Sequence, residues 1–155
     1  MIQRIQSLYL AAIFLLSLLL FNGAVLSFST ATGDVINLLY AGRIVDSAGQ
    51  VFAQVGIIRL LPFIIVPIPL ISLITLLIFR RRRIQRILAH VIIVFSSALI
   101  IILSAGIFLM TTRYNTTIIP GYKIAIPLII LILSLLARGG IIRDDRLIKS
   151  YDRLR

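Results

Sequence analysis

Four long apolar runs divide the chain and predict its main elements. Residues 8–28 and 60–79 contain no charged side chain, and the only titratable side chain in residues 87–110 is a histidine. The shortest run covers residues 124–137. A helix rises about 1.5 Å per residue, so about 20 residues cross the roughly 30 Å hydrocarbon core of a bilayer. We therefore predict four transmembrane helices, at about residues 8–28, 57–79, 87–110 and 122–138.

Two of these runs have a second interpretation. The fourth has only fourteen residues between Lys123 and Arg138, but long basic side chains can extend to the headgroups, so we predict that it also spans. The first follows Arg4 and resembles a secretory signal peptide. Because it is longer than a typical signal core, we interpret it as a retained membrane helix.

The two segments on the far side of the predicted bundle carry strand patterns. Residues 35–40, in the loop 29–56, alternate with period two, and a turn at residues 46–49 separates two short apolar stretches. This pattern is typical of a β-hairpin. The second loop, 111–121, contains the stretches 111–114 and 116–119, which could add a strand. The loops predict a small extracytoplasmic β-hairpin or sheet that caps the bundle.

The last thirteen residues predict a separate element. The pair Gly139-Gly140 is expected to end the fourth helix, which closes a transmembrane domain at residues 1–142. Within the tail 143–155, Leu147, Ile148, Tyr151 and Leu154 have the spacing of one helical face, with basic residues opposite. The tail is therefore predicted to be a cytoplasmic C-terminal amphipathic helix.

Composition supports a bilayer as the solvent of this chain. Hydrophobic residues make up 60% of the sequence and charged residues 14%, against about 45–50% and about 25% in soluble domains. A water-soluble fold of 155 residues could not bury so much apolar surface. We predict an all-α membrane protein whose fold is a four-transmembrane-helix bundle.

The net charge is +11, and the distribution of the basic residues indicates how the chain is oriented in the membrane. With the N-terminus inside, the cytoplasmic segments, including the basic loop 80–86, hold twelve Lys and Arg residues, and the outer segments hold four. Such an excess places both termini in the cytoplasm. Because the basic residues flank apolar runs, we expect them to contact anionic headgroups and other membrane proteins, and we expect no nucleic-acid partner.

The sequence offers little catalytic chemistry. It has no cysteine and no glutamate, and its five aspartates lie in loops or in the tail. His90 is the single histidine, and one histidine without neighbouring ligands does not make a common zinc site. We expect no catalytic residue, no metal, no cofactor and no enzymatic activity.

The two ends of the chain resemble a known family. The opening Met1-Ile2-Gln3-Arg4-Ile5-Gln6 and the closing Ile142-Arg143-Asp144-Asp145, followed by Ser150-Tyr151-Asp152-Arg153-Leu154-Arg155, are similar to the ends of a Bacteroidota family of small four-helix proteins. That family is described only as a domain of unknown function. Its tail usually has Lys-Asp-Glu and Ala where this chain has Asp144-Asp145 and Tyr151. The resemblance implies a bacterial inner membrane and supplies no activity.

The expected function is that of a non-enzymatic accessory or scaffold subunit. The bundle would anchor its basic loop and tail against a larger membrane complex, with protein export machinery as one candidate. The alternative is a small transporter or channel, suggested by helix prolines, small residues in the third helix and His90. The residues expected to contact the partner are Arg80, Arg81, Arg82, Arg83, Arg86, Arg143, Arg146, Lys149, Tyr151, Asp152, Arg153 and Arg155.

Overall fold

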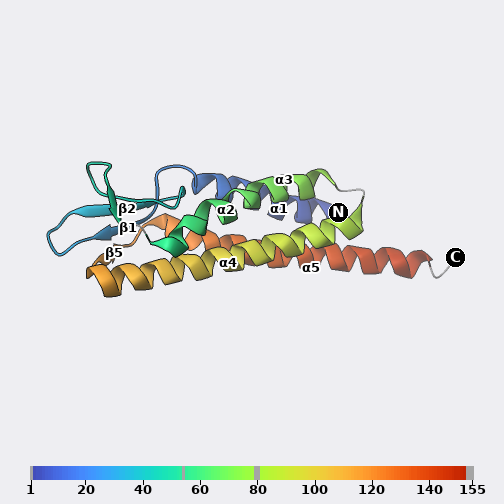
Figure 1. Cartoon of the computed structure of the whole chain (residues 1–155). Coiled ribbons are helices and arrows are strands. Elements are labelled where there is room, and N and C mark those ends of the chain that lie inside the picture. Colours follow the sequence, from blue (N-terminus) through green and yellow to red (C-terminus); the bar gives the residue numbers. More distant parts are fainter. Residues whose placement is uncertain (1, 54, 79–80, 153–155) are drawn as a thin grey trace.

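The protein is an elongated helical bundle with a small sheet at one end (Figure 1). This computed structural model describes residues 2–53, 55–78 and 81–152, with the side chains of residues 5–52, 55–78, 81 and 83–143. The helical elements are α1 (Ile2–Leu19), η1 (Gly56–Leu60), α2 (Leu61–Ile65), α3 (Pro67–Leu77), α4 (Arg82–Tyr114), η2 (Tyr122–Ala125) and α5 (Ile126–Asp152).

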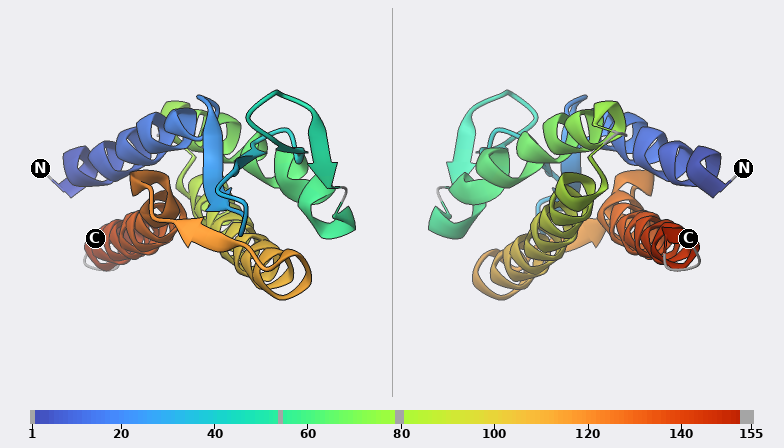
Figure 2. Two further views of the ribbon diagram at one scale, coloured as in Figure 1. Left: turned by 90° about the vertical axis from the view of Figure 1, so that its left-hand side faces the viewer. Right: turned by 90° about the vertical axis from the view of Figure 1, so that its right-hand side faces the viewer.

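The helices form a ring in which successive members run in opposite directions. Helix α1 packs against α3 and α5, and α4 packs against the same two helices. As a result, the start of α1, the α3–α4 connection and the later part of α5 all lie at one end, and the sheet lies at the other (Figures 1 and 2). The α3–α4 and α4–α5 connections are short, as is typical of an up-and-down bundle, whereas the connection from α1 to η1 contains most of the sheet.

Among the described residues, three helical segments are long and apolar enough to cross a membrane: Gly56–Leu77, Arg83–Tyr114 and Tyr122–Arg143. The apolar part of α1, Ile5–Leu19, is shorter. The sequence pattern predicted the reverse for the first and fourth helices: the first apolar run was expected to be a full membrane span, and the fourth was expected to be the weakest span. The difference arises because the first run is divided between two elements, whereas the fourth helix extends well beyond its apolar stretch.

The prediction of a helix over residues 8–28 is wrong at its C-terminal end. Helix α1 stops at Leu19, the chain turns at Gly23 with a φ of +68°, and residues Ala24–Ser29 form strand β1. Glycine adopts positive φ without steric cost. Beyond it, Leu26 and Phe28 are buried while Ser27 and Ser29 are half-buried, which is the two-residue period of a strand. Because both elements are apolar, hydrophobicity alone does not reveal the change from a helical period to the two-residue period of a strand.

The sheet has five antiparallel strands in the order β4-β3-β2-β1-β5. The predictions of a strand near residues 35–40, of the hairpin and of a strand after residue 116 are confirmed. Residues 111–114 instead form the last turn of α4. The strands besides β1 are β2 (Val35–Leu39), β3 (Ile44–Val45), β4 (Val51–Ala53) and β5 (Thr117–Ile119).

One face of the sheet joins the hydrophobic core. Phe28 on β1 pairs with Ile36 on β2 and with Ile118 on β5, and both Phe28 and Ile36 are fully buried. On the opposite face the Ser27 hydroxyl donates to Asn37 Oδ1 at 2.8 Å. The sheet therefore caps the bundle with its apolar side, because that side has no other cover.

Helix α4 is longer than predicted at both ends. It begins at Arg82 rather than at residue 87, so most of the predicted basic loop 80–86 is helical. It ends at Tyr114, where Asn115 takes a left-handed φ of 47°. Its 33 residues give a length of about 50 Å. This exceeds the thickness of a hydrocarbon core, and the last turns of α4 lie beside the sheet (Figure 1).

The prediction that Gly139-Gly140 ends the fourth helix is also wrong. Helix α5 continues through both glycines to Asp152, so the backbone of residues 143–152 extends α5 instead of forming a separate helix. A Cβ at Gly140 would lie 2.8 Å from Gln6 Cγ of α1. Glycine therefore lets α1 and α5 approach closely, as small residues do between membrane helices.

The two glycines should respond differently to substitution. A Cβ at Gly139 meets no heavy atom within 4 Å, so Gly139→Ala should stabilise the protein by about 0.5–1 kcal/mol through helix propensity. Gly140→Leu should destabilise it by about 1–3 kcal/mol through overpacking against Gln6. Equilibrium unfolding of both variants in detergent measures the difference, and equal effects would contradict the close α1–α5 contact.

Candidate functional site

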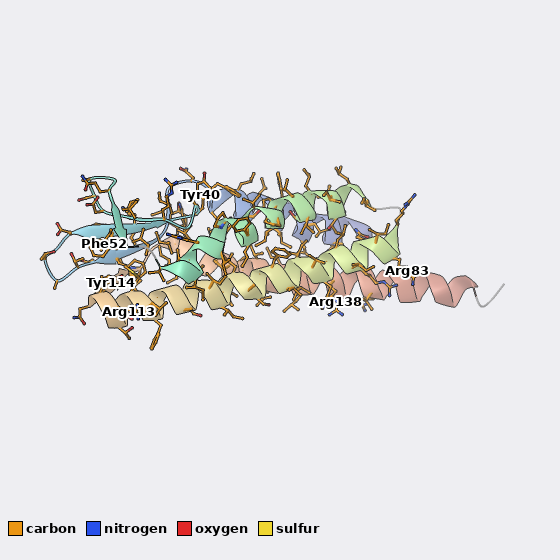
Figure 3. The ribbon with its side chains drawn as sticks, in the orientation of Figure 1. Tyr40, Phe52, Arg83, Arg113, Tyr114 and Arg138 are labelled. Carbon is orange, nitrogen blue, oxygen red and sulfur yellow. The ribbon has the colours of Figure 1, made fainter. Side chains whose placement is uncertain are left out.

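The arginines of the predicted contact surface lie at the end of the bundle opposite the sheet. Arg81 precedes α4, Arg83 and Arg86 lie in its first turns, and Arg143 lies on α5. Arg81, Arg83 and Arg143 are exposed, and Arg86 is half-buried. Figure 3 shows Arg83 near this end, with Arg138 further along α5 toward the sheet. We call the set Arg81, Arg83, Arg86, Arg138 and Arg143 the basic end.

Helix packing holds the basic end in place. Helices α4 and α5 pack side by side, so the arginines at the start of one lie beside those on the later part of the other. Gln85 is buried and its Nε2 donates to the carbonyl of Thr75 on α3 at 3.4 Å. This contact ties the first turns of α4 to the end of α3, so the arginines project from a fixed helix.

Most of the basic end is not neutralised within the described part of the chain. No ion pair or hydrogen bond joins the guanidinium groups of Arg81, Arg83, Arg138 or Arg143 to a described residue, whereas Arg86 does have a contact. The described carboxylates, Asp34 and Asp46, lie in turns of the sheet at the opposite end. Among the described residues, the basic end is therefore a cationic surface.

The other predicted contact residues are described in part or not at all. Arg80, Arg153 and Arg155 lie outside the described residues. The backbone of Arg82 belongs to α4, and α5 includes the backbone of four tail residues whose side chains are not described: Arg146, Lys149, Tyr151 and Asp152.

Nearly the whole sequence matches one protein family. The profile described as "Domain of unknown function (DUF4293)" matches residues 2–154. The chain belongs to the DUF4293 family. The resemblance at the two ends of the sequence is thus confirmed as membership in a family of unknown function. No curated protein matches the chain, and no solved structure matches it.

The match of the DUF4293 domain covers both the helices and the sheet, so the sheet belongs to the domain and is not an added module. Within the described residues, no group of three or more His, Cys, Asp or Glu side chains could hold a metal ion. His90 is exposed on the surface of α4 and does not point into the bundle core.

One polar residue of this DUF4293 domain has a position that the sequence did not indicate. Lys123 was expected at the surface, at the start of the fourth helix, but only 9% of its area is exposed. Its Nζ donates to the carbonyl of Asn22, just beyond α1. No local pattern predicts this contact, because it joins residues that are 101 positions apart.

Proposed function

We propose that this DUF4293 domain is a multi-pass protein of the bacterial inner membrane, with four membrane helices and both termini in the cytoplasm. Three helices have the length and composition to span, and α1 packs alongside them between α3 and α5. The arginine-rich end is the end expected to stay in the cytoplasm. The sheet would then cap the bundle on the outer side.

Single cysteines test this topology, because the chain contains none of its own. We expect Ser47→Cys, in the exposed turn between β3 and β4, to react with an impermeant maleimide added outside intact spheroplasts. Ser150→Cys, near the end of α5, should react only after the membrane is opened. Equal labelling of both cysteines in intact spheroplasts would contradict the orientation.

Within this topology, we propose that the domain is a non-enzymatic accessory or scaffold subunit. Its basic end and the projecting part of α5 would dock on a larger membrane complex, with protein export machinery as the candidate. One observation carries the proposal: exposed arginines on two packed helices lack an ion-pair partner among the described residues. A partner with a clustered acidic surface would supply the missing charges, with bidentate carboxylate pairs as the strongest contacts.

The alternative of a transporter or channel gains no support from the bundle core. The buried hydroxyls of Ser17, Ser72, Thr75, Ser96 and Ser134 each donate to a carbonyl of their own helix, at 2.6–3.0 Å. Hydroxyls used in this way have no free donor to offer a permeating solute. These bonds explain how the core accommodates the polar side chains of the described residues.

Co-purification in mild detergent tests the docking surface. We expect the wild-type chain to retain a defined membrane partner and a chain lacking residues 143–155 to lose it. The triple variant Arg81→Gln, Arg83→Gln, Arg143→Gln should reduce recovery of the partner at least tenfold, because it removes three exposed charges from the surface.

Arg113→Gln is the matched control for charge removal. Arg113 is exposed at the opposite end of α4, so its loss should leave recovery of the partner unchanged. If the deletion and the triple variant both keep the wild-type partners at wild-type yield, the basic end is not the docking surface.

A further inference from the structure

A second charged site lies at the sheet end, where the buried Lys123 borders a cavity. The cavity has a volume of about 270 Å³ and is lined by residues of β1, β5 and η2 and of the segment between β5 and η2. Among them are Ala24, Ser27, Ile119, Gly121, Tyr122 and Lys123. Strand β1 pairs with β5 and also contacts η2. Figure 1 shows these elements meeting where the sheet joins the bundle.

The ammonium group of Lys123 lies next to this cavity and is only partly satisfied. Its Nζ donates one hydrogen bond to the carbonyl of Asn22, and it lies 6.0 Å from the centroid of the Tyr122 ring. An ammonium has three N–H donors, and no hydrogen bond joins the other two to a described residue. Lys123 itself lines the cavity, so these donors can face the open space.

No carboxylate neutralises Lys123 within the described part of the chain. Asp34 accepts from the Thr32 hydroxyl at 2.7 Å, and Asp46 accepts from the amides of Ala48 and Gln50 at 2.9 Å. Both aspartates thus serve turns of the sheet. Burying a cation without a counter-charge is unfavourable, and the neutral carbonyl of Asn22 does not cancel the charge.

We infer that the cavity beside Lys123 binds a phosphate group, and that the molecule which carries it is an anionic lipid. A phosphate oxygen would accept the unused N–H donors and neutralise the buried charge. The side chains beside the cavity suit an acyl chain, since Tyr122 is 74% exposed and Ile119 is 39% exposed. Aromatic and basic residues at the end of a membrane helix are typical of the headgroup region.

The site depends on the proposed membrane insertion but not on the basic end, because the two surfaces lie at opposite ends of the bundle. Given the proposed topology, the bound lipid belongs to the outer leaflet. Its headgroup would bridge the N-terminal part of the last helix and β1. The Lys123–Asn22 hydrogen bond joins only the start of the last helical segment to the turn after α1. The bound headgroup would add the sheet to this contact.

Native mass spectrometry of the full chain in a neutral detergent tests the inference. We expect one molecule of phosphatidylglycerol to bind in preference to phosphatidylcholine. Lys123→Met should weaken binding of phosphatidylglycerol at least tenfold, and Lys123→Arg should restore most of it. Arg113→Met, which removes an exposed charge outside the cavity lining, should leave it unchanged.

A second variant separates loss of the site from loss of the fold. Gly121 lines the cavity with a φ of −112°, and a Cβ there would meet no heavy atom within 4 Å. Gly121→Leu should therefore fold normally, keep the Lys123–Asn22 contact, and reduce lipid binding by filling the cavity. A melting temperature within a few degrees of wild type confirms that the variant is folded.

Inorganic phosphate alone distinguishes the two sources of the anion. If it saturates the site and displaces phosphatidylglycerol at low millimolar concentration, the phosphate chemistry stands and the ligand is a soluble phosphate. Binding of phosphatidylglycerol that is unchanged in both Lys123→Met and Gly121→Leu would overturn the inference. So would equal binding of phosphatidylcholine and phosphatidylglycerol by the wild-type chain.

Discussion

Gly42→Ala should destabilise the protein by about 2–4 kcal/mol, because two independent penalties act at one position. Gly42 has a φ of +71°, and a left-handed backbone costs a residue with a Cβ about 1–2 kcal/mol. In addition, the new Cβ would lie 2.6 Å from the carbonyl oxygen of Ile58 and 2.9 Å from the Cα of Arg59. These are backbone atoms, which cannot rotate away as a side chain does.

This contact matters because it seats the sheet on the bundle. Gly42 closes the turn between β2 and β3, with its amide donating to the carbonyl of Leu39 at 3.0 Å. The turn lies directly against η1, which leads into α2. Displacing it should loosen the outer strands β3 and β4, so limited proteolysis should cut the variant near residues 46–50 faster than the wild type.

Gly49→Ala is the control that isolates the steric part. Gly49 also has positive φ, +79°, but a Cβ there would meet nothing within 4 Å. Its substitution should cost only the backbone penalty of about 1–2 kcal/mol. Equilibrium unfolding in detergent compares the two variants, and equal destabilisation would show that the turn does not press on η1.

Phe28→Ala should have the largest effect of any truncation in the sheet, about 3–5 kcal/mol. The side chain is fully buried on the face that joins the bundle core, between Ile36 and Ile118 of the neighbouring strands. Removing the ring leaves a cavity in the contact between the sheet and the helices. The melting temperature in detergent and the rate of proteolysis in residues 30–53 should both report the loss.

A second phenylalanine of the same sheet provides the comparison. Phe52 on β4 is 42% exposed, and its ring lies 5.7 Å from that of Tyr114 at the end of α4. Phe52→Ala should lose that aromatic contact, worth about 0.5–1.5 kcal/mol, and little else. A cost at Phe52 equal to that at Phe28 would contradict the assignment of the buried face.

The proposed site is known from the sequence only in part. The basic cluster near residues 80–86 and its relation to the later part of α5 follow from charge placed beside apolar runs, and the structure brings the two together. Lys123 could not be found this way. A lysine that ends an apolar run predicts an exposed headgroup contact, and its burial depends on Asn22 and β1, far away along the chain.

The sequence by itself determined the helical bundle, the number of apolar segments, and the strands at residues 35–39, 44–45, 51–53 and 117–119. These follow from local periodicity, which a single chain segment displays. Only the tertiary structure decided that residues 24–29 join the sheet, that α4 and α5 extend beyond their apolar runs, and that Lys123 is buried. Each of these depends on partners distant in sequence. A strand needs neighbours for its hydrogen bonds, Gly140 packs against Gln6 of α1, and the buried ammonium needs the acceptor that the turn after α1 supplies.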